Sequence, residues 1–78
     1  MNNLPSGVYT HFKDPKKEYE VVGVALHTES REQMVVYRPL YEDAAAELFV
    51  RPLSMFVESV DKPEIGYSGP RFVQVRSD

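Results

Sequence analysis

The distribution of apolar and polar residues along the chain indicates short β-strands separated by turns. Residues 7–12 are rich in β-branched and aromatic types, and residues 34–38 form a similar run that Pro39 ends. Residues 53–56 have the length of a single 3₁₀ turn. The pattern predicts five or six antiparallel strands, near residues 7–12, 19–28, 34–38, 48–51, 57–60 and 71–75.

The longest predicted strand, residues 19–28, is apolar on both of its faces. Gly23 in its interior indicates a bulge or a sharp bend. We expect the face with Val22 and Val24 to point inward, and the face with Tyr19, Val21 and Ala25 is the alternative. The predicted core comprises Val22, Val24, Leu26, Val36, Leu48, Val50, Phe56, Val60 and Phe72.

We expect the segments between these strands to be loops and turns. Three lysines surround Pro15 in residues 13–17 and indicate a solvated loop. Residues 29–33 have hairpin length, and residues 42–47 favour a helix but are too short for a stable one, so we expect a loop with one helical turn. Short strands with hardly any helix predict an all-β fold, a small antiparallel SH3-like barrel (a roll) with one 3₁₀ turn. An OB-like barrel is the alternative.

Length and composition limit the chain to a single small domain, which we place at residues 7–76, after a short N-terminal tail of residues 1–6. The 78 residues leave no room for a second domain, and 42% hydrophobic residues suffice for a core. The chain has no Cys, which excludes disulfides and thiolate metal sites. It also shows no secretory signal and no apolar run of membrane-spanning length. We therefore expect a cytoplasmic protein without membrane contact.

The charge balance bears on partners. Twelve acidic residues against nine basic ones give a net charge of −3, which disfavours nucleic acid, because that binding depends on neutralising phosphates. No Gly-rich phosphate loop occurs, and we expect no bound cofactor. We therefore expect the partner to be a protein or a peptide. Small barrels commonly bind extended ligands in aromatic grooves, so this expectation rests in part on analogy with the fold. We also expect the domain to be a monomer.

Four sequence blocks carry a resemblance to a known family. They are YxHFK at residues 9–13, YxVxGxAxHxE at 19–29, MVVYxxLY at 34–41 and VRPxxMF at 50–56, with a further match at 71–72. Taken together, they resemble a small bacterial family of uncharacterised proteins, the domain of unknown function 1653. The resemblance implies an SH3-like barrel and no established activity.

Few residues suggest chemistry. His27 and Glu29 are two positions apart, so on a strand they share a face, where the carboxylate could orient the imidazole for acid–base catalysis. His11 and His27, with either Glu29 or Glu32, could also form a three-ligand metal site, although the two histidines are sixteen residues apart. No nucleophile motif is present. A small acid–base or metal-assisted enzyme is the runner-up function, and we expect neither catalytic residues nor a metal.

Aromatic and arginine side chains suggest binding. In a small barrel the ends of neighbouring strands gather at one rim. The residues that we expect there, as a binding site for a protein or peptide, are His27, Glu29, Tyr37, Tyr41 and Arg51.

Two structural alternatives to that site remain. The tyrosines could merely surround the barrel with their hydroxyl groups outward. Arg51 could pair with one of the nearby acids, Glu29, Glu32 or Glu58, and hold strands together.

Overall fold

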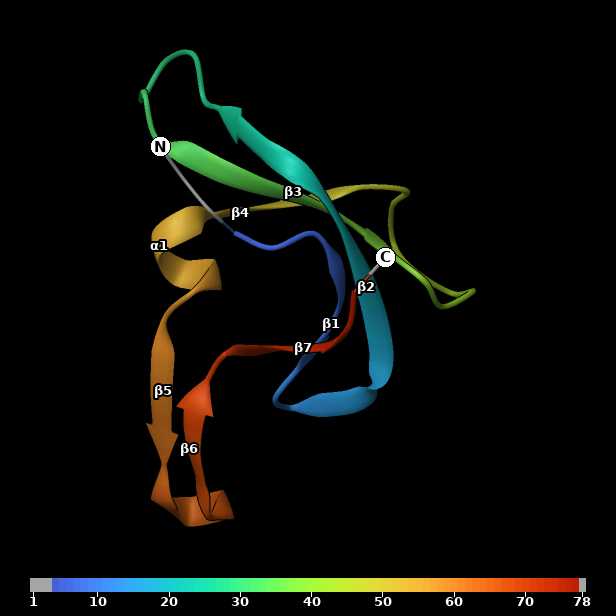
Figure 1. The fold of residues 1–78 in the computed structure, drawn as a ribbon, viewed down its shortest axis with the longest axis vertical. Helices are drawn as coiled ribbons and strands as arrows, with labels where there is room; N and C mark the ends of the chain where they lie inside the picture. The colour runs from blue at the N-terminus through green and yellow to red at the C-terminus, as the bar shows by residue number, and fades with distance from the viewer. Residues whose placement is uncertain (1–3, 78) are drawn as a thin grey trace.

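The computed structural model describes residues 4–77 and shows a fold of antiparallel strands (Figure 1). The strands are β1 (Gly7–His11), β2 (Asp14–Leu26), β3 (Gln33–Pro39), β4 (Phe49–Pro52), β5 (Ser59–Lys62), β6 (Tyr67–Pro70) and β7 (Phe72–Arg76). One α-helical turn, α1 (Leu53–Phe56), follows β4, and one 3₁₀ turn, η1 (Pro63–Ile65), joins β5 to β6. The predicted all-β class with a 3₁₀ turn is confirmed.

The strands form two sheets. Five strands pair in the order β4-β3-β2-β1-β7, and β5 and β6 form a separate hairpin that projects from one end of the molecule (Figure 1). The large sheet curls but stays open within the described chain, because its edge strands β4 and β7 do not pair. The barrel is therefore not closed. β4 has only four residues and ends at Pro52, which has no N–H to donate, and the chain then turns into α1.

Several elements differ from those predicted. The turn at 53–56 is α-helical, and the 3₁₀ turn lies at Pro63–Ile65 instead. Residues 42–47 contain turns and bends but no helix. β6 has a Gly and a Pro among its four residues and was not predicted; it forms because it pairs with β5, with Gly69 opposite Val60. β2 begins at Asp14, so only two residues connect it to β1.

The bulge predicted at Gly23 is confirmed. Val21 pairs with Tyr37 and Gly23 pairs with Val36, so Val22 is an extra residue without a partner in the ladder. An extra residue reverses the alternation of side chains beyond it. Val24, which pairs with the fully buried Val35, therefore lies on the same side of the sheet as Val21.

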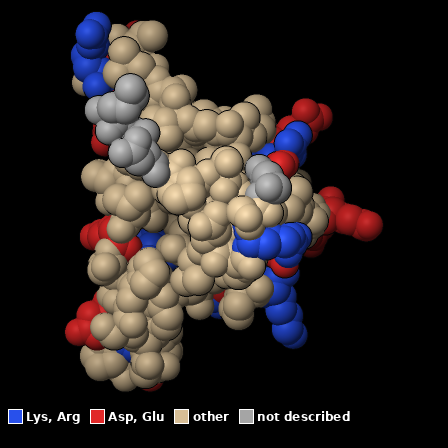
Figure 2. Space-filling view, in the orientation of Figure 1, with Lys and Arg blue, Asp and Glu red and all other residues tan. Residues whose placement is uncertain are grey.

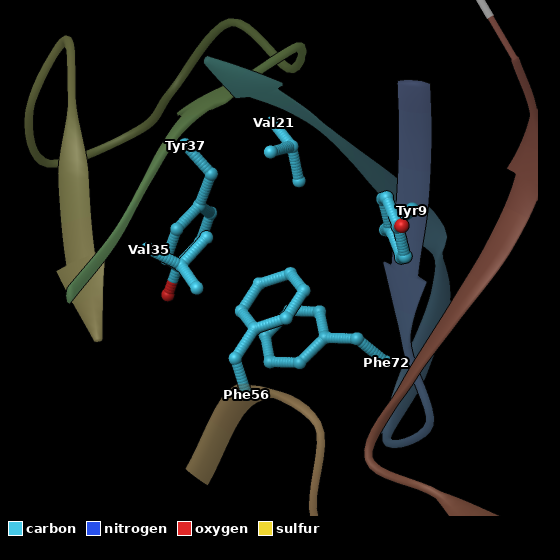
Figure 3. Close-up of a cluster of buried hydrophobic side chains, with 6 residues drawn as sticks. All are labelled: Tyr9, Val21, Val35, Tyr37, Phe56 and Phe72. Carbon is cyan, nitrogen blue, oxygen red and sulfur yellow. The ribbon is translucent and has the colours of Figure 1, made fainter. Parts of the chain in front are cut away.

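The core is mainly aromatic and differs from the predicted set. Phe56, Val60 and Phe72 are buried as predicted, and Val36 is half-buried. Val22, Val24, Leu26, Leu48 and Val50 are exposed, by 38 to 60%, so their placement in the core was wrong. Phe56 and Phe72 belong to the main buried cluster, whose other members are Tyr9, Val21, Val35 and Tyr37 (Figure 3). Tyr19 packs against this cluster.

The geometry of the strands explains this error. β4 is an edge strand whose odd-numbered residues point inward, because Phe49 and Arg51 pair with the buried Tyr37 and Val35. Val50 therefore points outward. Val24 and Leu26 lie on the inner side, but toward the turn of the β2–β3 hairpin: Val24 is opposite Val35, at the margin of the cluster, and Leu26 is opposite the exposed Gln33.

The N-terminal residues that the structure describes lie against the sheet. Leu4 packs against the core cluster, and the Tyr9 hydroxyl donates a hydrogen bond to the Pro5 carbonyl oxygen at 2.7 Å. The Gln74 side chain donates to the Ser6 carbonyl oxygen at 2.9 Å. Positions 1–3 of the predicted tail lie outside the described residues. No helix in residues 4–77 is long and apolar enough to cross a membrane.

Candidate functional site

His27 and Glu29 lie in the exposed turn between β2 and β3. The imidazole Nδ1 of His27 accepts hydrogen bonds from the backbone N–H groups of Glu29 and Ser30, both at 3.2 Å. The His27 backbone also bonds to residues 31 and 32, which closes the turn. These contacts shape the hairpin turn, and they join the His27 ring to the backbone of Glu29 and Ser30 rather than to the Glu29 carboxylate.

Tyr41 comes shortly after β3, at the end of the β2–β3 hairpin that is opposite to its turn. Its ring lies edge-on to Tyr19, with centroids 5.7 Å apart, and the Lys17 ammonium lies 4.8 Å from the centre of the Tyr41 ring. Burial first, and the neighbouring Tyr41 hydroxyl second, raise the pKa of Tyr19. Beside Tyr41 is a shallow hollow of about 420 Å³, lined by Arg38, Pro39, Tyr41, Ala44, Ala46, Glu47 and Leu48.

Tyr37 and Arg51 come together on the inner side of the sheet. Arg51 Nε lies 3.4 Å from the Tyr37 hydroxyl, to which it donates a long hydrogen bond. The Arg51 guanidinium carbon lies 5.3 Å from the centre of the Phe72 ring, within range of a cation–π interaction. Phe72 belongs to β7, so the Arg51 side chain spans the gap between the two unpaired edges of the sheet.

Arg51 lacks the carboxylate partner that Arg38, Arg71 and Arg76 have. The ion pairs among the described residues are Arg38–Glu20 at 2.6 Å, Arg71–Glu58 at 3.0 Å and Arg76–Glu18 at 2.7 Å. Figure 2 shows acidic and basic side chains close to one another at several places around the margin of the molecule. Within residues 4–77, no carboxylate lies at ion-pair distance from Arg51. The alternative in which Arg51 pairs with Glu29, Glu32 or Glu58 is therefore wrong. Glu58 pairs with Arg71 instead.

His11, at the end of β1, also lies beside Phe72, the ring that Arg51 contacts. Its ring packs edge-on against Phe72, with centroids 4.9 Å apart, and stacks on Phe12 at 4.8 Å. The Lys13 backbone N–H donates to His11 Nδ1 at 3.1 Å, so the neutral imidazole carries its proton on Nε2. We call the group of His11, Tyr37, Arg51 and Phe72 the seam.

The electrostatic surroundings of His11 disfavour its protonation. Burial lowers the pKa of His11 first, and the positive charges of Arg51, Arg71 and Lys13 lower it further. Arg71 contributes another unusual feature, because its Nε is a buried nitrogen without a hydrogen-bond partner among the described residues. Arg51 therefore gives the seam a positive charge that no ion pair offsets, in a chain of net charge −3.

The lowered pKa of His11 predicts that stability falls as the pH falls. The unfolded histidine, with a pKa of about 6.5, takes up a proton at a pH where the folded one does not. The stabilisation is complete above the unfolded pKa and is lost as the pH falls through the lower folded value. Urea unfolding at about pH 7.5 and about pH 5.5 should show a smaller loss of stability in His11→Gln than in the wild type. Equal losses would contradict the prediction.

The five residues expected at one rim thus lie in three places. Tyr37 and Arg51 are in contact at the seam, Tyr41 is beside the hollow, and His27 and Glu29 are in the hairpin turn. Gln33, which pairs with the residue before His27, is four positions from Tyr37, or about 13 Å along the strand. Any binding role of these residues stays a prediction.

The two histidines considered as metal ligands do not come together in the structure. His11 is on β1, whereas His27 is in the β2–β3 turn. Across the described part of the chain, no three His, Cys, Asp or Glu side chains lie close enough to share a metal ion.

Comparison with known proteins identifies the family. The family described as "Protein of unknown function (DUF1653)" matches residues 7–74. The crystal structure of a protein of that family from Bordetella bronchiseptica is similar to this one, with a TM-score of 0.83 and 33% sequence identity over 97% of this chain and 92% of that chain. A search of curated proteins finds no match. The resemblance seen in the sequence is confirmed, and the chain belongs to the DUF1653 family.

Proposed function

We propose that the domain is a protein-interaction module that binds an extended segment of a partner protein at the seam. The observation that carries the proposal is Arg51, a half-buried cation without a carboxylate partner in residues 4–77. Partly burying an unpaired charge is unfavourable, and the structure offers only the Tyr37 hydroxyl and the Phe72 ring in return. A partner that brings a negative or polar group would complete its interactions.

The surroundings of Arg51 suit recognition. Tyr37 and Phe72 are buried and locked among other rings, so the floor under the guanidinium is rigid before any ligand binds. Arginine and tyrosine side chains on such supports are the residue types that dominate binding energies at protein interfaces.

The backbone at the seam also favours an extended ligand. β4 is an edge of the large sheet, and no strand of the described residues pairs with its outer side. A peptide in the extended conformation can add to such an edge through main-chain hydrogen bonds. β4 spans four residues, or about 13 Å, so it would hold a short segment.

Panning random peptides displayed on phage against the purified domain tests the proposal. We expect peptides to be enriched and to bind Arg51→Ala at least about tenfold more weakly, because arginine contacts of this kind commonly dominate affinity. Arg38→Ala is the matched control: Arg38 is also a strand arginine, but it is exposed and already paired with Glu20. Its removal should leave peptide affinity unchanged.

The variant must also remain folded for the comparison to count. Arg51→Ala should destabilise the domain by less than about 2 kcal/mol, since it loses one long hydrogen bond and one ring contact. Thermal unfolding measures this. Panning that enriches no peptide, or peptides that bind both variants like the wild type, would show that the seam is not a binding site.

A further inference from the structure

We infer that the group recognised at the seam is a carboxylate, held by the Arg51 guanidinium with the His11 Nε2–H as a second donor. The inference rests on the proposed function, because it names the chemistry that the same site would bind. The carboxylate could be an acidic side chain or the C-terminus of a partner protein, and both offer the same two oxygens.

The two donors lie beside the same aromatic ring, and the charge of Arg51 is near enough to lower the pKa of His11. The Arg51 guanidinium and the His11 ring both lie within 5.3 Å of the centre of the Phe72 ring. Arg51 uses Nε for Tyr37, so its two terminal nitrogens remain for a ligand. The hydrogen bond to the His11 ring is accepted by Nδ1. Within residues 4–77, no hydrogen bond involves His11 Nε2, which is therefore available to a ligand. A planar carboxylate accepts two parallel hydrogen bonds from such a guanidinium.

The charge at the seam selects a singly charged anion. Arg71 is neutralised by Glu58 at 3.0 Å, and the lowered pKa of His11 keeps its imidazole neutral near pH 7. The Lys13 side chain is exposed, 6.0 Å from the Phe12 ring, so water screens its charge. Arg51 therefore supplies one unpaired positive charge. A carboxylate matches it, whereas a doubly charged phosphate would leave excess negative charge on a chain of net charge −3.

Three synthetic peptide libraries test the inference. All are N-acetylated and randomised, with Asp and Glu left out, around one fixed central residue. The first has a central Glu and an amidated end, the second a central Gln and an amidated end, and the third a central Gln and a free C-terminal carboxylate. Each library is passed over immobilised wild-type domain and over Arg51→Gln, and the retained fraction is measured.

We expect wild-type domain to retain the first library, the third or both at least about tenfold more than the second. Arg51→Gln should remove this difference. The library that is retained identifies the source of the carboxylate. His11→Phe keeps the ring but loses the donor, so it should reduce retention of the acidic libraries alone, and His11→Gln, which keeps an N–H, should restore part of it.

Other outcomes separate the two proposals. The wild-type domain could retain all three libraries equally, and more strongly than Arg51→Gln does. That result would support peptide binding at the seam but would overturn the recognition of a carboxylate. No retention above the Arg51→Gln level would overturn both. Elution of the acidic libraries by inorganic phosphate more effectively than by acetate at equal ionic strength would also overturn the choice of a carboxylate.

Discussion

Replacing Phe56 by Ala is expected to remove most of the domain's stability. Phe56 is 1% exposed, and its ring stacks on Phe72 with centroids 4.1 Å apart, while Tyr9 and Tyr37 pack edge-on against it (Figure 3). Removing a buried Phe costs about 3–5 kcal/mol. A domain this small has a stability near the lower end of about 5–15 kcal/mol, so the variant should be largely unfolded by urea or heat under mild conditions.

Val50→Ala is the matched control for that experiment. The apolar pattern placed Val50 in the core beside Phe56, but the structure leaves it 60% exposed. Its truncation should cost less than about 1 kcal/mol. Comparing the urea midpoints of the two variants checks the assignment of the inner face. A Val50→Ala loss as large as that of Phe56→Ala would show that the sheet buries the opposite side.

Gly7→Ala is expected to destabilise the domain strongly through its backbone. Gly7 has a φ of 137°, which residues with a side chain rarely adopt. A Cβ there would lie 2.6 Å from the Arg76 carbonyl oxygen and 2.7 Å from the Gln74 side-chain nitrogen. Strain and overlap together should cost about 2–5 kcal/mol, because β1 would have to move away from β7. Thermal unfolding measures the loss.

Gly23→Ala provides the control within the same sheet. A Cβ at Gly23 would meet no atom within 4 Å beyond its chain neighbours among the described residues, and the φ of Gly23 is not positive. The substitution should change stability by less than about 1 kcal/mol, and a small gain is expected from the stiffer unfolded chain. If Gly7→Ala lost as little stability as Gly23→Ala, β1 could not approach β7 as closely at Gly7 as the structure shows.

Local sequence patterns located most of the strands, with β6 as the exception, but not the faces that the strands bury. Gly23 correctly indicated a bulge in the longest strand, yet the extra residue also reverses the side-chain alternation, which depends on the register with β3. The pairing of β4 with β3 likewise decides that Arg51, and not Val50, points inward. Register is a property of two strands at once, so a pattern within one strand cannot fix it.

The seam could be predicted only in part for the same reason. Arg51 and Tyr37 were both expected in a binding site, and they are in contact. His11 was considered only as a metal ligand, because its neighbour Phe72 is sixty-one positions away and reaches it through the pairing of β1 with β7. The absence of a carboxylate at Arg51 among the described residues depends on Glu58 pairing with Arg71, which the composition could not show.

Chemical-shift mapping by NMR tests the central claim most directly. The highest-affinity peptide from panning is titrated into ¹⁵N-labelled domain, and the residues whose signals move are identified. We predict that the changes centre on His11, Arg51 and Phe72, including the side-chain N–H of Arg51. Changes centred on His27 and Glu29, or on the hollow beside Tyr41, with the Arg51 signals unmoved, would contradict the assignment of the seam as the binding site.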